Sequence, residues 1–234
     1  MREKGKKTQP CDLSWSRQYL DGVTWFFDVG VGPPGYDEAG WYLDEFPDWK
    51  FLGFEANVEY YRQRVKTFPG TMLHMGVGDR EENRVFYLEG GNSSYQIPAG
   101  VGRREVITVK MVTLDWAWNY ADRPEGVYLW MDIEGGEMNA LLGAKEMLSA
   151  VRAINLEISD APRFHDQPTR GELDGFLWEA GFRAIREHSH AARSYDLFYI
   201  RRDQKIIRER FRYATRRTGQ RGQSRRPLDS SMIR

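Results

Sequence analysis

A glycine-rich turn followed by an acid is the first segment of the chain whose residue types could do chemistry. Residues 24–36 read TWFFDVGVGPPGY, in which Gly30, Gly32 and Gly35 form a G-x-G-x-x-G pattern. Glycines let a backbone turn tightly and approach a ligand closely. Glu55 follows twenty residues after Gly35, where a carboxylate can accept hydrogen bonds from ribose hydroxyls. The pattern predicts a nucleoside site, and its literal form is the dinucleotide-binding fingerprint.

Asp28 bears on which nucleoside the turn would hold. It stands two residues before Gly30, at the end of the strand expected over residues 25–29. A carboxylate at this place would repel a pyrophosphate, whereas it could orient the turn or meet the ammonium group of an amino-acid ligand. The residues therefore favour S-adenosylmethionine, a nucleoside that carries an amino acid and no phosphate.

Two more carboxylates follow a strongly apolar run at residues 127–133. Asp132 and Glu134 would lie at the carboxyl edge of a parallel sheet, where open α/β folds bind ligands. Burial there can raise a carboxyl pKa and suit the group to general-base work, so both are candidate catalytic residues. The alternative is that Glu134 or Glu137 caps the following helix, near the positive end of its dipole.

The segment SDAPRFHDQPT, residues 159–169, adds a second set of candidates after the next strand. His165 could take the proton of a substrate hydroxyl, because the unperturbed pKa of histidine lies near neutrality. Alternatively, Asp132 with Glu157 or Asp160 could hold a divalent cation such as Mg²⁺, which prefers oxygen ligands. A histidine in a surface loop often has no such role, so catalysis and metal binding both stay open.

The elements that must position these residues alternate between strand and helix. Two late strands have too few residues between them for a crossover helix, so they must form an antiparallel hairpin. The order predicts one α/β domain with a mostly parallel sheet and one reversed strand. Such a terminal hairpin is foreign to the usual dinucleotide-binding order. We expect strands near residues 25–29, 50–55, 72–77, 85–88, 106–109, 127–133, 153–158, 182–186 and 195–200, and helices from Pro33-Pro34 to 46 and over 58–68, 137–148 and 172–180.

Several short motifs follow one another in order between residues 25 and 159. They are Phe27-Asp28-Val29-Gly30, Gly53-Phe54-Glu55-Ala56-Asn57, Met75-Gly76-Val77-Gly78-Asp79, Asn92-Ser93-Ser94, Val112-Thr113-Leu114-Asp115, Asp132-Ile133-Glu134-Gly135-Gly136-Glu137 and Asn155-Leu156-Glu157-Ile158. Together they resemble the FkbM family of S-adenosylmethionine-dependent methyltransferases. The resemblance implies the class I methyltransferase (Rossmann-like) fold, a seven-stranded sheet with an antiparallel last strand.

The resemblance also implies O-methylation of a hydroxyl on a sugar or secondary metabolite, so the partner would be a small-molecule or glycan acceptor. Two departures stand out. Gly32 replaces the asparagine that is common in the family's first loop, and Trp130 stands where the family often has lysine. The cofactor contacts implied for this sequence are Asp28, Gly30, Gly32, Glu55, Ala56, Asn57, Gly78, Asp79 and Asp132.

Composition limits the remaining classes of function. The only cysteine is Cys11, which excludes an intramolecular disulfide and agrees with a reducing, cytoplasmic location. No apolar run approaches the roughly 18 residues that a membrane-spanning helix needs. We expect an N-terminal extension over residues 1–20, the methyltransferase domain over 21–202 and a basic tail over 203–234.

The basic tail leaves two rival functions open. Residues 201–234 hold twelve Lys and Arg against three acids, a net charge of +9. Such a segment could meet an anionic partner, so a nucleic-acid-binding protein is one alternative. A nicotinamide-dependent oxidoreductase is the other, because of the literal glycine fingerprint.

Overall fold

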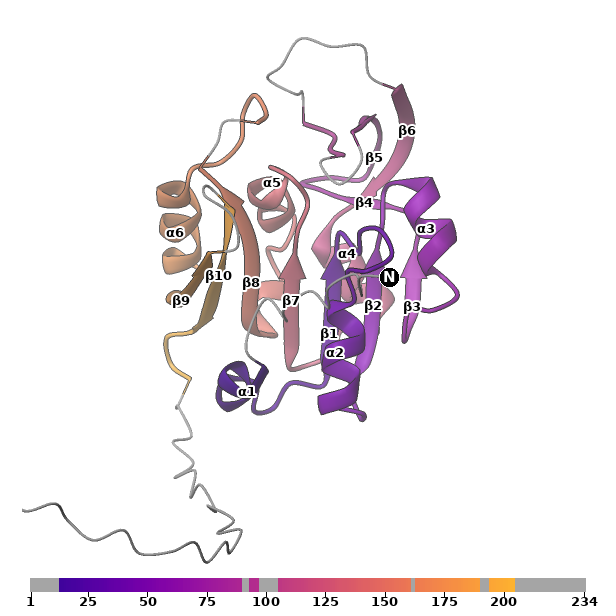
Figure 1. The fold of residues 1–234 in the computed structure, drawn as a ribbon. Coiled ribbons are helices and arrows are strands. Elements are labelled where there is room, and N and C mark those ends of the chain that lie inside the picture. Colours follow the sequence, from indigo (N-terminus) through magenta and orange to yellow (C-terminus); the bar gives the residue numbers. More distant parts are fainter. Residues whose placement is uncertain (1–12, 90–92, 97–104, 161–162, 190–193, 205–234) are drawn as a thin grey trace, which may run out of the picture.

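A seven-stranded sheet runs through the centre of the structure, a computed structural model that describes residues 13–89, 93–96, 105–160, 163–189 and 194–204 (Figure 1). The strand order is β3-β2-β1-β7-β8-β10-β9. Every pair from β3 to β8 is parallel, whereas β10 runs antiparallel to both β8 and β9. The predicted hairpin and single reversed strand are thus confirmed. The strands are β1 (Trp25–Val29), β2 (Lys50–Phe54), β3 (Thr71–Leu73), β7 (Val127–Met131), β8 (Val151–Ser159), β9 (Phe182–Ser189) and β10 (Ser194–Arg201).

Helices cover both faces of this sheet, because strand side chains alternate and both faces are apolar. Phe26 belongs to the buried cluster on the side of α1, α2 and α3, while Phe27 belongs to the cluster on the side of α4, α5 and α6 (Figure 1). The helices are α1 (Leu13–Ser16), α2 (Glu38–Glu45), α3 (Val58–Arg64), α4 (Leu114–Tyr120), α5 (Glu137–Leu142) and α6 (Arg170–Glu179), with short 3₁₀ turns at Arg17–Tyr19 and Met147–Ser149.

A second, three-stranded sheet lies beyond the carboxyl end of the first one. Its order is β4-β6-β5, formed by β4 (Gly76–Val77), β5 (Glu82–Leu88) and β6 (Glu105–Val112). The single strand expected over residues 72–77 is therefore wrong. The chain pairs with β2 through Leu73, then leaves the large sheet and pairs with β6 through Gly76 and Val77. The apolar run continues across both sheets, so hydrophobicity alone does not mark the break.

Two helices also differ from the expectation. The helix expected to start at Pro33-Pro34 begins only at Glu38, after Gly35 has turned the chain with φ +104°. Residues 114–120 form α4, which the sequence did not predict. Thr113 caps this helix, since its hydroxyl accepts a hydrogen bond from the Trp116 N–H at 3.0 Å. Trp118 is buried on one face, whereas Trp116 and Tyr120 stack on another with centroids 5.3 Å apart, and this division obscured the helical pattern.

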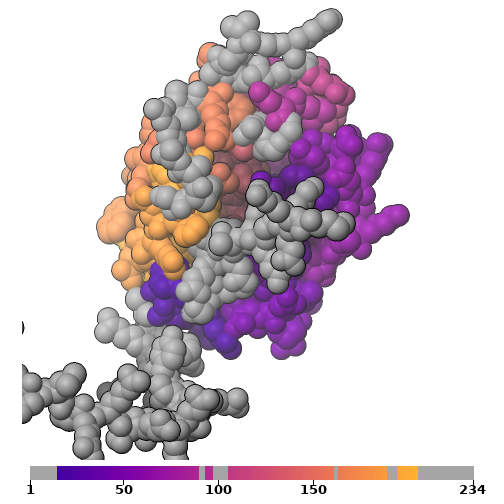
Figure 2. All heavy atoms as spheres, viewed as in Figure 1, coloured from indigo at the N-terminus to yellow at the C-terminus, as the bar shows by residue number. Residues whose placement is uncertain are grey.

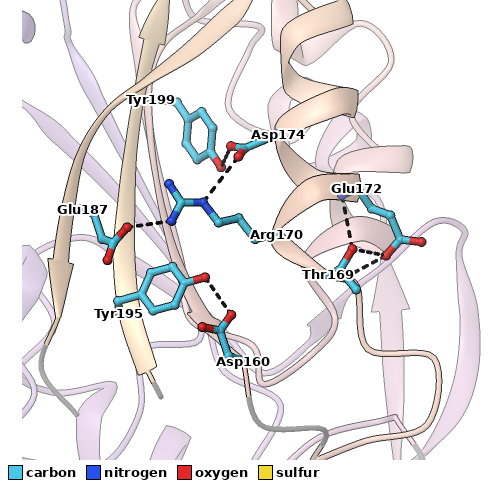
Figure 3. Close-up of polar contacts among 8 residues, drawn as sticks. All are labelled: Asp160, Thr169, Arg170, Glu172, Asp174, Glu187, Tyr195 and Tyr199. Carbon is cyan, nitrogen blue, oxygen red and sulfur yellow. Dashed lines mark hydrogen bonds and ion pairs between the residues drawn. The ribbon is translucent and has the colours of Figure 1, made fainter. Parts of the chain in front are cut away.

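Helix α6 is fixed to the terminal hairpin by a network of paired polar groups, which we call the α6 corner (Figure 3). The Arg170 guanidinium donates to Glu187 at 2.6 Å and contacts Asp174 at 3.4 Å. The Tyr199 hydroxyl donates to Asp174 at 2.7 Å, and the Tyr195 hydroxyl donates to Asp160 at 2.9 Å. Thr169 and Glu172 close the helix start as a capping box.

The two ends of the sheet lie far apart on the molecule. Figure 2 shows violet residues of β2, α3 and β3 on one side and orange residues near β10 on the other, as the strand order requires. Residues of the expected N-terminal extension pack on the sheet: the Trp15 ring meets Phe198 with centroids 5.4 Å apart, and Leu20 is buried. The basic tail from residue 205 lies outside the described residues. Among the helices that the structure describes, none is long and apolar enough to cross a membrane.

Candidate functional site

A cavity of about 330 Å³ opens at the carboxyl ends of β1, β2, β7 and β8. This is the edge where open α/β sheets bind ligands. The strand ends, the loop after β1 and the start of α2 supply most of its wall, and the small sheet adds Phe86. The sequence-predicted residues in its lining are Gly30, Gly32, Glu55, Ala56, Asp132, Glu134 and Glu157.

The glycine turn after β1 lies against the end of β7. Gly30 has φ +93°, and a Cβ placed on it would lie 1.9 Å from the carbonyl oxygen of Asp132. Only glycine therefore lets these two strand ends approach so closely. Gly32 also has a positive φ, of +70°, but a Cβ there would meet nothing nearer than Tyr36 at 3.9 Å. The space beside Gly32 stays open toward the cavity.

Glu55 ties the turn to the end of β2. Its carboxylate accepts the Gly32 N–H at 2.8 Å and the Asn57 N–H at 2.7 Å. Burial raises the pKa of Glu55 to about 7, although these backbone hydrogen bonds favour the charged form. Ala56 lines the cavity beside it. Asn57 does not line the cavity; its side chain caps α3 by accepting the Glu59 N–H at 2.9 Å, and its backbone N–H holds Glu55.

Two acids lie at the other side of the turn. Asp28 is buried behind the cavity wall, and its Oδ2 atom has no hydrogen-bond partner among the described residues. Burial and the nearby Glu38 raise the pKa of Asp28 well above its usual value. Glu38 itself lines the cavity from the first turn of α2, and burial raises its pKa to about 7. The sequence analysis missed Glu38, although an acid just after a glycine turn was a usable signal.

Three carboxyl groups gather at the ends of β7 and β8. Asp132 lies beside Glu157, and burial together with the charges of Glu157 and Glu134 raises the pKa of Asp132 well above its usual value. Burial and Glu157 raise the pKa of Glu134 to about 7. Glu134 makes no cap bond to α5; Glu137 instead accepts the Gly135 N–H at 3.3 Å. The arrangement suits proton transfer near neutral pH.

Arg163 closes this end of the cavity, and the sequence analysis missed it. Its guanidinium donates to Glu134 at 3.1 Å and to the Ser194 hydroxyl at 3.2 Å. It thereby joins the loop after β8 to the end of β7 and the start of β10. The sequence could have indicated Arg163, because it is the one arginine or lysine in the segment 159–169, which also holds two aspartates.

Four other predicted residues lie away from the cavity. Gly76 and Val77 line the cavity at the place where Gly78 and Asp79 were expected. The Asp79 carboxylate instead forms an ion pair with the Arg80 guanidinium, at an N–O distance of 3.7 Å. His165 is exposed beside a separate surface hollow that also includes Asp160. The structure therefore brings together Asp132 and Glu157 but not Asp160.

Metal binding finds no support at this site. Within the described ranges, no group of three or more His, Cys, Asp or Glu side chains is placed to hold a metal ion.

Comparison with known proteins assigns the chain to a family. The family described as Methyltransferase FkbM domain matches residues 36–184. The FkbM methyltransferase structure from Methylobacillus flagellatus KT is 15% identical, with a TM-score of 0.48 over 76% of this chain and 43% of that one. The chain thus spans less than half the length of that protein. Magnesium protoporphyrin IX methyltransferase (ChlM) from Synechocystis PCC 6803, with bound SAM, is 12% identical, with a TM-score of 0.42 over 81% of this chain and 76% of that one. No curated protein sequence matches significantly.

Proposed function

Because the chain belongs to the FkbM methyltransferase family, we propose that it transfers a methyl group from S-adenosylmethionine to a hydroxyl oxygen of a sugar or secondary metabolite. The observation that carries the proposal is the position of Glu55. Its buried carboxylate is held by two backbone N–H groups beside an open glycine turn. Such a carboxylate keeps lone pairs for the two hydroxyls of a ribose.

The residues present fit this methyl donor. A volume of about 330 Å³ lies in the range of pockets that hold small molecules. Glu55 would hold the ribose, while Ala56, Met75, Val77 and Phe86 offer an apolar wall for the adenine. The open turn at Gly30 and Gly32 would receive the amino-acid end, with Glu38 beside it for the ammonium group. When bound, S-adenosylmethionine supplies an electrophilic methyl group on a sulfonium.

The same features argue against a pyrophosphate, and hence against a nicotinamide cofactor. Dinucleotide sites place the phosphates at the N-terminus of the helix after the glycines. Here α2 begins only at Glu38, and both Asp37 and Glu38 stand at its start. Two carboxylates at that place would repel phosphate. The oxidoreductase alternative therefore has no support, and no finding supports an anionic partner for the basic tail.

Asp132 is the proposed general base. In the transfer, the acceptor oxygen forms its bond to the methyl carbon, the carbon–sulfur bond breaks onto sulfur, and a carboxyl group takes the hydroxyl proton. Asp132 lines the cavity beside Glu157. Burial raises the pKa of Asp132, which makes its carboxylate a stronger base than that of an exposed aspartate. Positioning of the acceptor would supply the larger part of the rate enhancement.

The first test is ligand-induced stabilisation. A ligand at a hundred times its dissociation constant stabilises a protein by about 2.7 kcal/mol, which thermal unfolding detects. We expect S-adenosylhomocysteine to raise the unfolding temperature, and NAD and MgCl₂ alone to leave it unchanged. A rise with NAD and none with S-adenosylhomocysteine would refute the proposal. Mass spectrometry of hydroxyl-bearing compounds incubated with enzyme and S-adenosylmethionine then locates the methyl group.

A further inference from the structure

An arginine is buried behind the glycine turn, outside the lining of the cavity. Arg64 ends α3, and its side chain is only 7% exposed. It is not among the residues that line the cavity, so a ligand there would not touch it. Its Nε atom and the Oδ2 atom of Asp28 are both buried without a hydrogen-bond partner among the described residues. Because arginine is almost never buried so deeply without anionic groups around it, its surroundings indicate what it does.

Arg64 holds the far end of the loop between β1 and α2, residues 30–37, which we call the donor loop. Its Nη2 atom lies 3.2 Å from Oδ1 of Asp37, the residue before the first turn of α2. The Asp37 side chain makes no cap bond to that helix. Its carboxylate fills the space beside Gly40, where a Cβ would collide with it. Asp37 is therefore fixed between Arg64 and the bare backbone of Gly40.

The near end of the donor loop has an anchor of its own. The Gly32 N–H donates to the Glu55 carboxylate at 2.8 Å, which ties the loop to the end of β2. Between the two anchors, Gly32, Pro33 and Tyr36 line the cavity. The shape of the wall that would receive the methyl donor thus depends on Glu55 at one end and on the Arg64–Asp37 pair at the other.

The charge of Arg64 also acts on the two acids that flank the donor loop in the cavity wall. Burial raises the pKa of Glu38 and of Glu55 to about 7, and the positive charge of Arg64 opposes that rise in both. Asp37 and Asp196 also act on Glu38, and as acids they raise its pKa further. A Coulomb interaction weakens with distance, so Arg64 lies near both cavity acids. It favours their ionised forms.

We propose that Arg64 is a positioning residue for the methyl donor, which it places by anchoring the donor loop through Asp37. The inference rests on the proposed function. With the loop held, Glu55 faces the ribose hydroxyls and Glu38 faces the ammonium group. Hydrogen bonds to ionised carboxylates are stronger than those to neutral ones, so the charge of Arg64 strengthens both contacts. Arg64 itself touches neither the donor nor the acceptor.

Arg64→Met tests the proposal, because methionine keeps an apolar stem and removes the charge. We expect S-adenosylhomocysteine to bind at least about tenfold more weakly in isothermal titration at pH 7, because both carboxylate contacts weaken. The KM for S-adenosylmethionine should rise by a similar factor. At saturating donor, kcat should stay within about twofold of the parent, since the proposed base Asp132 is untouched. A loss of folded protein alone would lower kcat and leave KM unchanged.

Three further variants separate positioning from folding. Arg64→Lys keeps the charge and should recover most of the affinity. Arg62→Met, on the exposed side of α3, should bind like the parent. Asp37→Ala removes the anchor of a half-exposed side chain, so it keeps the proposal testable if Arg64→Met does not fold. It should weaken binding by about threefold in the parent and not further in Arg64→Met, because the two residues act as a pair.

The pH dependence of binding is a readout that a structural defect would not move. Protonation of Glu38 and Glu55 weakens both contacts, so affinity should fall as the pH is lowered. Without Arg64 the pKa values of both acids rise, and the fall should begin at a higher pH in Arg64→Met than in the parent or Arg64→Lys. Titrations between pH 6 and 8.5 measure it.

Two results would overturn the proposal. One is an affinity of Arg64→Met or of Asp37→Ala equal to that of the parent. The other is a weaker affinity of Arg64→Met that lysine does not restore and whose pH profile has not moved. Failure of the parent itself to bind S-adenosylhomocysteine refutes the proposed function and this inference with it, whereas normal binding by the parent and by every variant overturns this inference alone.

Discussion

Two groups of carboxylates in this molecule have opposite surroundings. In the α6 corner, Asp174 and Glu187 are each about two-fifths exposed, and Arg170 binds both (Figure 3). In the cavity, Glu38 and Glu55 are less than a tenth exposed, and no ion pair joins either of them to a basic side chain in the part of the chain that the structure describes. The corner is a solvated network whose partners are all part of the chain. The cavity holds buried acids, of which Glu134 is paired with Arg163.

The difference between the two groups is their access to water. Exposed ion pairs are worth little, because water already stabilises the separate charges. Buried carboxyl groups lose that water, so their pKa values rise unless a cation compensates. Burial raises the pKa of Glu38, Glu55 and Glu134 to about 7.

The largest expected effect is on catalysis. Asp132→Asn should lower kcat by about 10²- to 10⁴-fold, the usual loss when a general base is removed. Binding of S-adenosylhomocysteine should change little, because the variant keeps the shape of the wall. The rate at which S-adenosylhomocysteine is released, measured with the best acceptor among the hydroxyl-bearing compounds, gives kcat. An unchanged kcat would show that Asp132 is not the general base. It would also contradict the distinction between catalytic acids in the cavity and structural acids in the α6 corner.

The next effect is on binding of the methyl donor. Glu55→Gln replaces one acceptor oxygen with an N–H donor that would face the backbone N–H of Gly32 or Asn57. A hydrogen bond to a charged group is worth about 1.5–3 kcal/mol, so affinity should fall roughly 10- to 100-fold. Titration with S-adenosylhomocysteine checks this. Glu187→Gln is the matched control and should bind it normally.

The pH dependence of stability distinguishes the two regions further. Glu38 has a pKa of about 7 in the folded protein against the ordinary 4.5, so between these values the folded state binds more protons than the unfolded state. Its stabilising contribution is complete below about pH 4.5 and is lost as pH rises through about 7. Glu38→Gln should therefore gain stability relative to the parent between pH 5 and 8, by roughly 2 kcal/mol. Urea unfolding at several pH values measures it.

The smallest expected effect is on stability, for a substitution in the α6 corner. Asp174→Asn weakens the contacts to Arg170 and Tyr199, and should lower the free energy of unfolding by about 1 kcal/mol. Its kcat and its affinity for S-adenosylhomocysteine should equal those of the parent. If kcat fell while the protein stayed folded, the corner would have to be treated as part of the active site.

Most of the fold could be predicted from the sequence, and so could the core of the site. The apolar run at residues 25–29, the closely spaced late strands and the glycines at 30 and 32 are local patterns that can be read without knowledge of distant contacts. Glu55 and Asp132 followed from their places at strand ends, because parallel strands bring those ends to one edge. The break between β3 and β4 was missed, because it depends on pairing with the distant β6.

What the sequence by itself determined is the order of the elements and the chemistry of the residues at the strand ends. Which acids share a cavity was decided only by the tertiary structure. Asp160 and Glu157 are three residues apart in sequence, yet one binds Tyr195 in the α6 corner and the other lies beside Asp132. Glu38 and Arg163 are far apart in the chain, yet both line the same cavity. Burial and pairing depend on contacts between distant segments, and these set the charge of the site.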